Sequence, residues 1–230
     1  MDIQKIKNFV YSYSSVEQAP DSTKLRKAAL ALICIAGLFS IFGFASGGAA
    51  LVISVTLIIV ATAYTITFLI YLARTPKPSF LQWFLMSGIA TAYFAIVFLI
   101  IAMLSITVAY KNIILSMLLI AGWLIICMLI LRIILVLINR GKFTGERKMS
   151  RSNSSIGAAI GVFVLGPLLG LAVRKYALSQ QIILAIMCML CIIVTCLASF
   201  AAIVNFLKYY YVWKYSLPER ESPKDFDKLP

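Results

Sequence analysis

The chain has 230 residues, of which 62% are hydrophobic and only 13% charged, and its mean hydropathy is +0.99. Soluble domains are about half apolar and about a quarter charged, so this composition excludes an ordinary water-soluble fold and predicts an integral membrane protein. The net charge is +13, and the complete absence of histidine removes the usual imidazole base and the commonest metal ligand.

Six apolar runs reach or come close to the length of about 20 helical residues that crosses a bilayer core. They cover residues 28–46, 49–73, 80–108, 113–138, 156–173 and 181–207, and short polar breaks separate them. The weakest break lies at 109–113, but residues 80–138 are too long for one span. We therefore predict an all-α integral membrane protein with a six-helix bundle of three hairpins at 28–207. A cytoplasmic segment, 1–27, precedes it, and a charged cytoplasmic tail, 208–230, follows.

The N-terminal segment allows two interpretations. Apolar residues recur at helical spacing over 2–14, which is typical of an amphipathic helix lying on the cytoplasmic leaflet, and the alternative is a disordered tail. A cleavable signal peptide would be a different interpretation of the first span. The polar lead of 27 residues is long for a signal peptide, so we expect an uncleaved anchor.

Acidic residues are confined to the two tails and one loop. Ion-coupled carriers usually keep an intramembrane carboxylate, and aspartyl intramembrane proteases need two. Both classes are therefore disfavoured, and no catalytic residue is predicted.

One basic residue lies inside a span, at Arg132. Its side chain is expected either to extend to the cytoplasmic headgroups or to face the bundle and bind an anionic group. Because no acid lies at its depth, an internal partner would have to be neutral, such as Ser87 or Thr91.

The loop after the fourth span carries five basic residues and one acid. Such a cluster beside a bilayer attracts anionic headgroups, so lipid rather than nucleic acid is the expected partner. The candidate contacts for anionic groups are Arg132, Arg140, Lys142, Arg147, Lys148 and Arg151.

The fifth span is short and rich in glycine. Its candidate helix-packing face consists of Gly157, Gly161, Gly166, Pro167 and Gly170. Small residues let helices approach closely and proline bends a helix, so this pattern favours a packing face with a kink. The alternative is a broken helix lining a carrier site, but the second span, its counterpart in an inverted repeat, has neither Gly nor Pro between residues 51 and 73.

All five cysteines lie in predicted spans, and Cys188 and Cys191 form a C-x-x-C pair. Redox relay chemistry would need a second pair in a loop, and a zinc site would need further ligands at the same depth. We interpret these thiols as packing residues and predict no cofactor or metal.

These features favour an accessory or immunity-type protein of the cell membrane that binds another membrane protein, an inserting toxin or a second copy of itself. The alternative is a transporter or channel for a lipid-like, apolar or anionic substrate. An intramembrane enzyme is disfavoured, because no base is evident beside any serine or cysteine.

The basic residues predict the orientation. One side of the membrane receives 17 of the 21 Lys and Arg residues, in the two tails and in the loops 74–79 and 139–155, so both termini and residues 140–155 are expected in the cytoplasm. A cysteine placed at Ser152 in a cysteine-free background should resist impermeant thiol reagents in intact cells. Labelling from outside would overturn this orientation.

Overall fold

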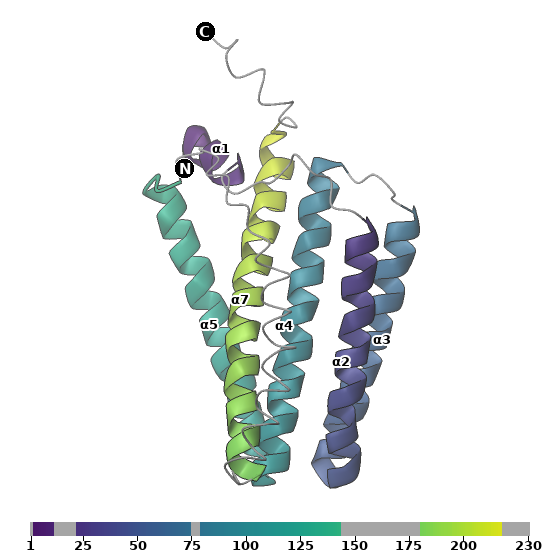
Figure 1. Ribbon diagram of the computed structural model, residues 1–230. Coiled ribbons are helices and arrows are strands. Elements are labelled where there is room, and N and C mark those ends of the chain that lie inside the picture. The colour runs from purple at the N-terminus through teal and green to yellow at the C-terminus, as the bar shows by residue number, and fades with distance from the viewer. Residues whose placement is uncertain (1, 12–21, 75–78, 144–179, 218–230) are drawn as a thin grey trace.

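The computed structural model describes residues 2–11, 22–74, 79–143 and 180–217. Its elements are α1 (Ile3–Tyr11), α2 (Ser22–Ser46), α3 (Gly48–Arg74), α4 (Phe80–Tyr110), α5 (Ile113–Asn139) and α7 (Gln180–Tyr215), and no strand occurs within the described ranges. Figure 1 shows the long helices standing side by side, with the short α1 across one end. The predicted span 156–173 lies outside the described residues.

Four helices are long and apolar enough to cross a membrane by length and composition. They are α3, α4, α5 and α7, whose apolar segments run over Gly48–Tyr71, Leu81–Tyr110, Ile113–Asn139 and Gln181–Tyr215. The described apolar part of α2, Ile33–Ser46, is shorter. The chain therefore has the helices of a multi-pass membrane protein.

Two ends of the bundle can be distinguished. The α1 end holds α1, the start of α4 and the ends of α5 and α7, whereas the turn end holds the α2–α3 and α4–α5 turns and the start of α7 (Figure 1). We use these two names below.

The break predicted at 109–113 is a two-residue turn, made by Lys111 and Asn112. Lys111 is left-handed, with φ 51°, and its N–H donates to the carbonyl of Thr107 over 2.9 Å. The side chain of Asn112 accepts a hydrogen bond of 2.9 Å from the N–H of Ile114, which caps α5. Across the turn, the hydroxyls of Thr107 and Ser116 lie 2.8 Å apart and join the two helices.

Helix α7 is longer than the predicted span 181–207, since it continues to Tyr215. Residues 208–215 contain neither Gly nor Pro, and their apolar side chains include Tyr211 and Val212, which are buried at the α1 end. The helix ends where Ser216 takes φ 46° and Leu217 N–H donates to the Val212 carbonyl over 3.2 Å, one residue before Pro218. The first eight residues of the predicted tail are thus part of the bundle.

The antiparallel pair of α4 and α7 forms the most extensive helix contact among the described elements. Contacts near both ends of the pair agree on a single antiparallel alignment of the two helices. Near the α1 end the amide of Asn205 donates to the hydroxyl of Ser87 over 2.9 Å, and near the turn end Ser105 lines one small cavity together with Met187. Figure 1 shows the two helices adjacent from end to end.

Small and weakly polar residues dominate the buried face of α7 between residues 184 and 202, and on α4 they alternate with larger apolar side chains. On α7 the buried residues recur every three or four positions: Leu184, Cys188, Cys191, Thr195, Ser199 and Ala202. On α4 the buried positions include Phe84, Gly88, Ala95, Phe98, Ala102 and Ser105. Lipid is as apolar as leucine, so close backbone approach and van der Waals contact, rather than exclusion of water, hold such helices together.

Helices α2 and α3 also pack closely, across the glycine turn at Gly47 and Gly48, where φ is +66° and +56°. The hydroxyl of Ser40 donates to the carbonyl of Ala36 over 2.7 Å and lies 3.4 Å from the carbonyl oxygen of Ser54 on the other helix. Gly43 faces the same contact, with no room for a side chain. The small residues of α2 therefore set the distance between these helices.

Aromatic stacking joins α3 to α4. The rings of Tyr64 and Tyr93 are 3.8 Å apart at 21°, and Tyr64 also stacks on Phe68 at 5.3 Å. These rings belong to the main core cluster, which includes Leu57 and Phe98. The core thus lies between α2, α3, α4 and α7, with α4 the most deeply buried of the four spanning-length helices and α5 the least.

Gly43 and Gly37 provide a matched test of the α2–α3 contact. A Cβ at Gly43 would lie 2.6 Å from the carbonyl oxygen of Ala50 and 2.9 Å from Leu104, whereas a Cβ at Gly37 would meet nothing within 4 Å. Gly43→Ala should therefore destabilise the protein by about 1–3 kcal/mol, and Gly37→Ala should be neutral or slightly stabilising. Thermal unfolding in mild detergent measures both. Equal midpoints for the two variants would contradict the close packing.

Candidate functional site

The most distinctive cluster of the described residues lies at the α1 end. Three side chains of α1, Ile6, Phe9 and Val10, are buried there against residues of three other helices and the segment after α7. We call the receiving residues the α1 dock: Phe84, Ile134, Ile138, Tyr211, Val212 and Leu217. Within the amphipathic pattern predicted for 2–14, residues 3–11 form a helix, and the apolar face of that helix packs on protein.

Polar contacts hold the start of α1 and attach one of its side chains to α5. The Asp2 carboxylate accepts a hydrogen bond of 3.0 Å from the N–H of Gln4, and the Asp2 carbonyl accepts one of 3.3 Å from the N–H of Ile6, so Asp2 caps the start of the helix. The ammonium of Lys5 donates to the carbonyl of Asn139 over 3.0 Å. That carbonyl belongs to the last turn of α5, where the helix dipole favours a cation.

Phe9 is the central anchor of α1 and is only 1% exposed. Its ring meets Phe143 edge to face at 5.0 Å and 67°, and Tyr211 at 6.2 Å and 88°. Phe143 follows α5 and Tyr211 lies on α7. One ring therefore joins α1 to both of these helices, with geometry that aromatic pairs prefer.

Lys208 of α7 lies beside Phe9 of α1, with an exposed fraction of only 3%. Its ammonium is 5.8 Å from the ring centre of Phe9 and 5.5 Å from that of Phe84. Cation–π attraction of this kind offsets part of the cost of removing the charge from water. Lys208 follows directly after the apolar run 181–207, so it was expected in the charged tail, and both rings are distant from it in the sequence.

Exposed basic residues lie near the dock, at the ends of α5 and α7. Arg140 and Lys142 of the predicted lipid-contact set are exposed just after α5, and Lys214 is exposed on α7 beside the rings of Tyr210 and Tyr215 at 5.4 and 5.6 Å. Arg132 is also exposed, seven residues before the end of α5, which corresponds to about 10 Å of helix. A guanidinium at that depth can reach headgroups.

The neutral groups considered as partners of Arg132 are engaged elsewhere. Ser87 accepts the hydrogen bond from Asn205, and the hydroxyl of Thr91 donates to the carbonyl of Ser87 over 2.7 Å. Farther along, the indole N–H of Trp123 donates to the hydroxyl of Ser199 over 2.9 Å, linking α5 to α7. Some polar groups of this bundle, such as Asn205 and Trp123, therefore join two helices, whereas others, such as Thr91, bond back to their own helix.

The remaining predicted site residues lie outside the described residues. They are Arg147, Lys148 and Arg151 of the basic loop, and Gly157, Gly161, Gly166, Pro167 and Gly170 of the fifth span.

Cys188 and Cys191 are buried in the main core cluster, on the α7 face that packs against α4. Within the described ranges, no group of three or more Cys, Asp or Glu side chains is placed to hold a metal ion. The position of the two thiols supports their interpretation as packing residues.

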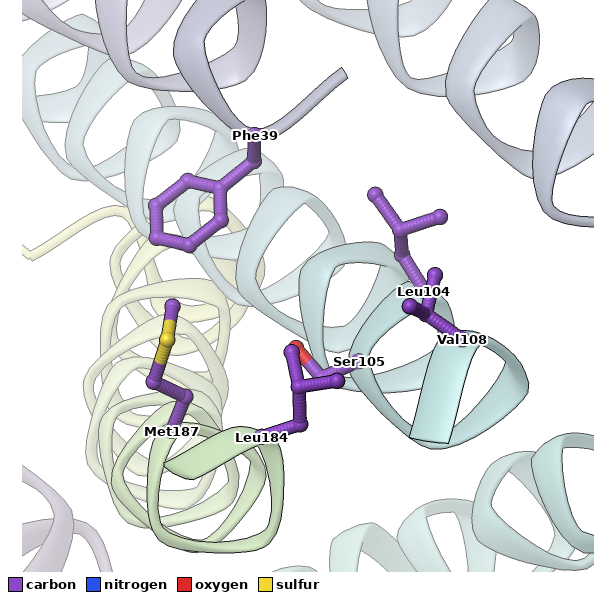
Figure 2. A pocket seen from close by; sticks show the side chains of 6 residues that line it. All are labelled: Phe39, Leu104, Ser105, Val108, Leu184 and Met187. Carbon is purple, nitrogen blue, oxygen red and sulfur yellow. The ribbon is translucent and has the colours of Figure 1, made fainter. Parts of the chain in front are cut away.

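The cavity between α2, α4 and α7 has a volume of about 10 Å³, room for a single water. Figure 2 shows its lining of Phe39, Leu104, Ser105, Val108, Leu184 and Met187. The one side-chain oxygen is the Ser105 hydroxyl, which already donates to the carbonyl of Ile101 over 2.9 Å. Ligand pockets usually enclose about 300–1,000 Å³, so this cavity is a packing defect near the turn end rather than a substrate site.

Fold and site together define an all-helical membrane protein with a basic, aromatic cluster at one end. The chain matches no protein-family model, and neither the curated proteins nor the solved structures contain a significant match to it.

Proposed function

We propose that this chain crosses the cell membrane six times as three hairpins, with both termini in the cytoplasm. Helix α5 ends at the α1 end and α7 begins at the turn end, so residues 144–179 must connect opposite ends of the bundle. Their one long apolar run is 156–173, the predicted fifth span, and its presence supports a total of six spans. The basic residues Lys5, Arg140, Lys142 and Lys214 gather at the α1 end, which supports its cytoplasmic location.

The protein's function, in this proposal, is to bind another membrane protein or an inserting toxin, as an accessory or immunity-type protein does. The observation that carries it is the exposed surface of α5, of which the described residues bury only Ser116, Ile134 and Ile138. Its exposed apolar residues include Met117, Leu118, Leu124, Ile125, Met128 and Leu129. Flexible methionines allow such a surface to adapt to a partner.

Gly122 gives this surface a point of close approach. A Cβ added there would meet no described atom within 4 Å, and its neighbour Ala121 is exposed. Transmembrane helices associate through small residues of this kind, because the backbones can then touch. We propose that a helix of the partner, or of a second copy, crosses α5 at Ala121 and Gly122.

Anionic headgroups complete the set of proposed partners. Arg132, Arg140 and Lys142 are exposed on or just after α5, and Arg147, Lys148 and Arg151 continue the same basic loop. Each basic residue near an anionic leaflet contributes about 1 kcal/mol. Neither catalysis nor nucleic-acid binding forms part of this proposal.

Gly122→Leu tests the proposed partner surface, with Thr56→Leu on the exposed side of α3 as the matched control. Purification of the tagged full chain in mild detergent should recover a membrane-protein partner or a homo-oligomer with wild type and with Thr56→Leu. Gly122→Leu should lose that complex at unchanged yield, since its side chain blocks backbone approach.

Three outcomes would contradict the proposal. A strictly monomeric wild type without a partner removes the interaction role, and loss of folded Gly122→Leu protein would show that the surface is covered within the chain itself. Uptake of a lipid-like or anionic solute by reconstituted liposomes would instead support the alternative, a transporter or channel.

A further inference from the structure

Helix α1 has one apolar face, and either of two surfaces could cover that face: the dock or a lipid bilayer. Ile6, Phe9 and Val10 are buried in the dock, while Ile3, in the first turn of the helix, is 52% exposed. A helix of nine residues is too short to be stable in water by itself, so α1 stays helical only while its apolar face is covered. The dock provides one cover, and a lipid surface provides another.

The position of α1 brings the second surface close. It lies across the ends of α5 and α7, and helices of membrane-spanning length end at the depth of a headgroup layer (Figure 1). Lys5 and Lys7 are partly exposed on α1. Amphipathic helices with lysines beside an apolar face bind anionic bilayers, because charge attraction adds to the burial of the apolar side chains.

The two covers exclude each other. Phe9 cannot contact Phe143 and Tyr211 and at the same time enter the acyl chains, and the ammonium of Lys5 cannot both bond the Asn139 carbonyl and pair with a lipid phosphate. The dock includes Ile134 and Ile138 of α5, so the position of α1 also affects how the end of α5 is held.

We propose that α1 is an exchangeable strap: its apolar face leaves the dock and inserts into an anionic leaflet, and this exchange releases the α1 end of α5. Lipid composition then sets the share of the docked state. The proposal requires no partner protein, so it stands or falls separately from the interaction role of α5.

Distances between spin labels measure the exchange directly. Cysteines replace Gln4, exposed on α1, and Val136, exposed on α5, in the full chain freed of its native cysteines. The protein is reconstituted into vesicles of phosphatidylcholine alone, and of phosphatidylcholine mixed with phosphatidylglycerol. We expect one short distance in the neutral vesicles and a second, longer distance when the anionic lipid is present.

The lysines of α1 should control the lipid response. Each lysine near an anionic surface is worth about a fivefold change in the ratio of the two populations. Lys7→Gln should therefore lower the ratio of the long- to the short-distance population about fivefold in anionic vesicles, and Lys7→Glu should lower it further. Both variants leave the contact of Lys5 with Asn139 in place. Lys214→Gln is the matched control, since it removes an exposed charge of the same end without altering α1, and it should respond like wild type.

Phe9→Ala tests the dock itself. It removes both ring contacts of α1, so the long distance should appear even in neutral vesicles. One unchanged short distance in both lipids and in every variant would overturn the proposal, because α1 would then be a fixed part of the bundle. A lipid response that the lysine variants leave unchanged would also overturn it.

Discussion

The antiparallel contact between α4 and α7 is the interaction on which the other elements depend. Helix α4 is the most buried of the spanning-length helices, and it contacts α2, α3, α5 and α7. A bilayer gives no hydrophobic reward for joining two apolar helices, so the small residues Gly88, Ala95 and Ala102 matter because they permit close approach. The Asn205 to Ser87 hydrogen bond adds a directional contact that fixes the register.

The two ends of this framework are held in different ways. At the turn end, short covalent turns and the Thr107 to Ser116 contact fix the helices. At the α1 end, α5 and α7 are joined through a separate amphipathic helix, with Phe9 and Lys5 as its main contacts. Contacts made by a short segment are easier to exchange than those within a helix pair, and the exchange proposed for α1 rests on this difference.

The apolar runs predicted the helical class, and they predicted the positions of α3, α4, α5 and α7 to within a few residues, except for the C-terminal end of α7. Such runs are informative because the length of an apolar run decides whether a helix can span a membrane. The runs could not predict which faces of the helices meet. These helices are apolar all round, so hydrophobic periodicity does not separate the Cys188 face of α7 from the Leu197 face exposed on the other side. Lys208 was missed for another reason, since Phe9 and Phe84 reach it only through the tertiary fold. The contrast between polar and apolar faces made the α1 helix one of two interpretations of its segment, and it gave no sign that the apolar face would pack on protein.

Cysteine cross-linking between α4 and α7 tests the central contact most directly. In a cysteine-free background, cysteines at Ser87 and Asn205, whose Oγ and Nδ2 atoms lie 2.9 Å apart, should cross-link with a short bifunctional thiol reagent in native membranes. A pair at Ser87 and the outward-facing Leu197 should not, because Leu197 is 63% exposed and lies more than two helical turns away along α7. Equal cross-linking of both pairs, or none at Ser87 and Asn205, would contradict the α4–α7 register and the account built on it.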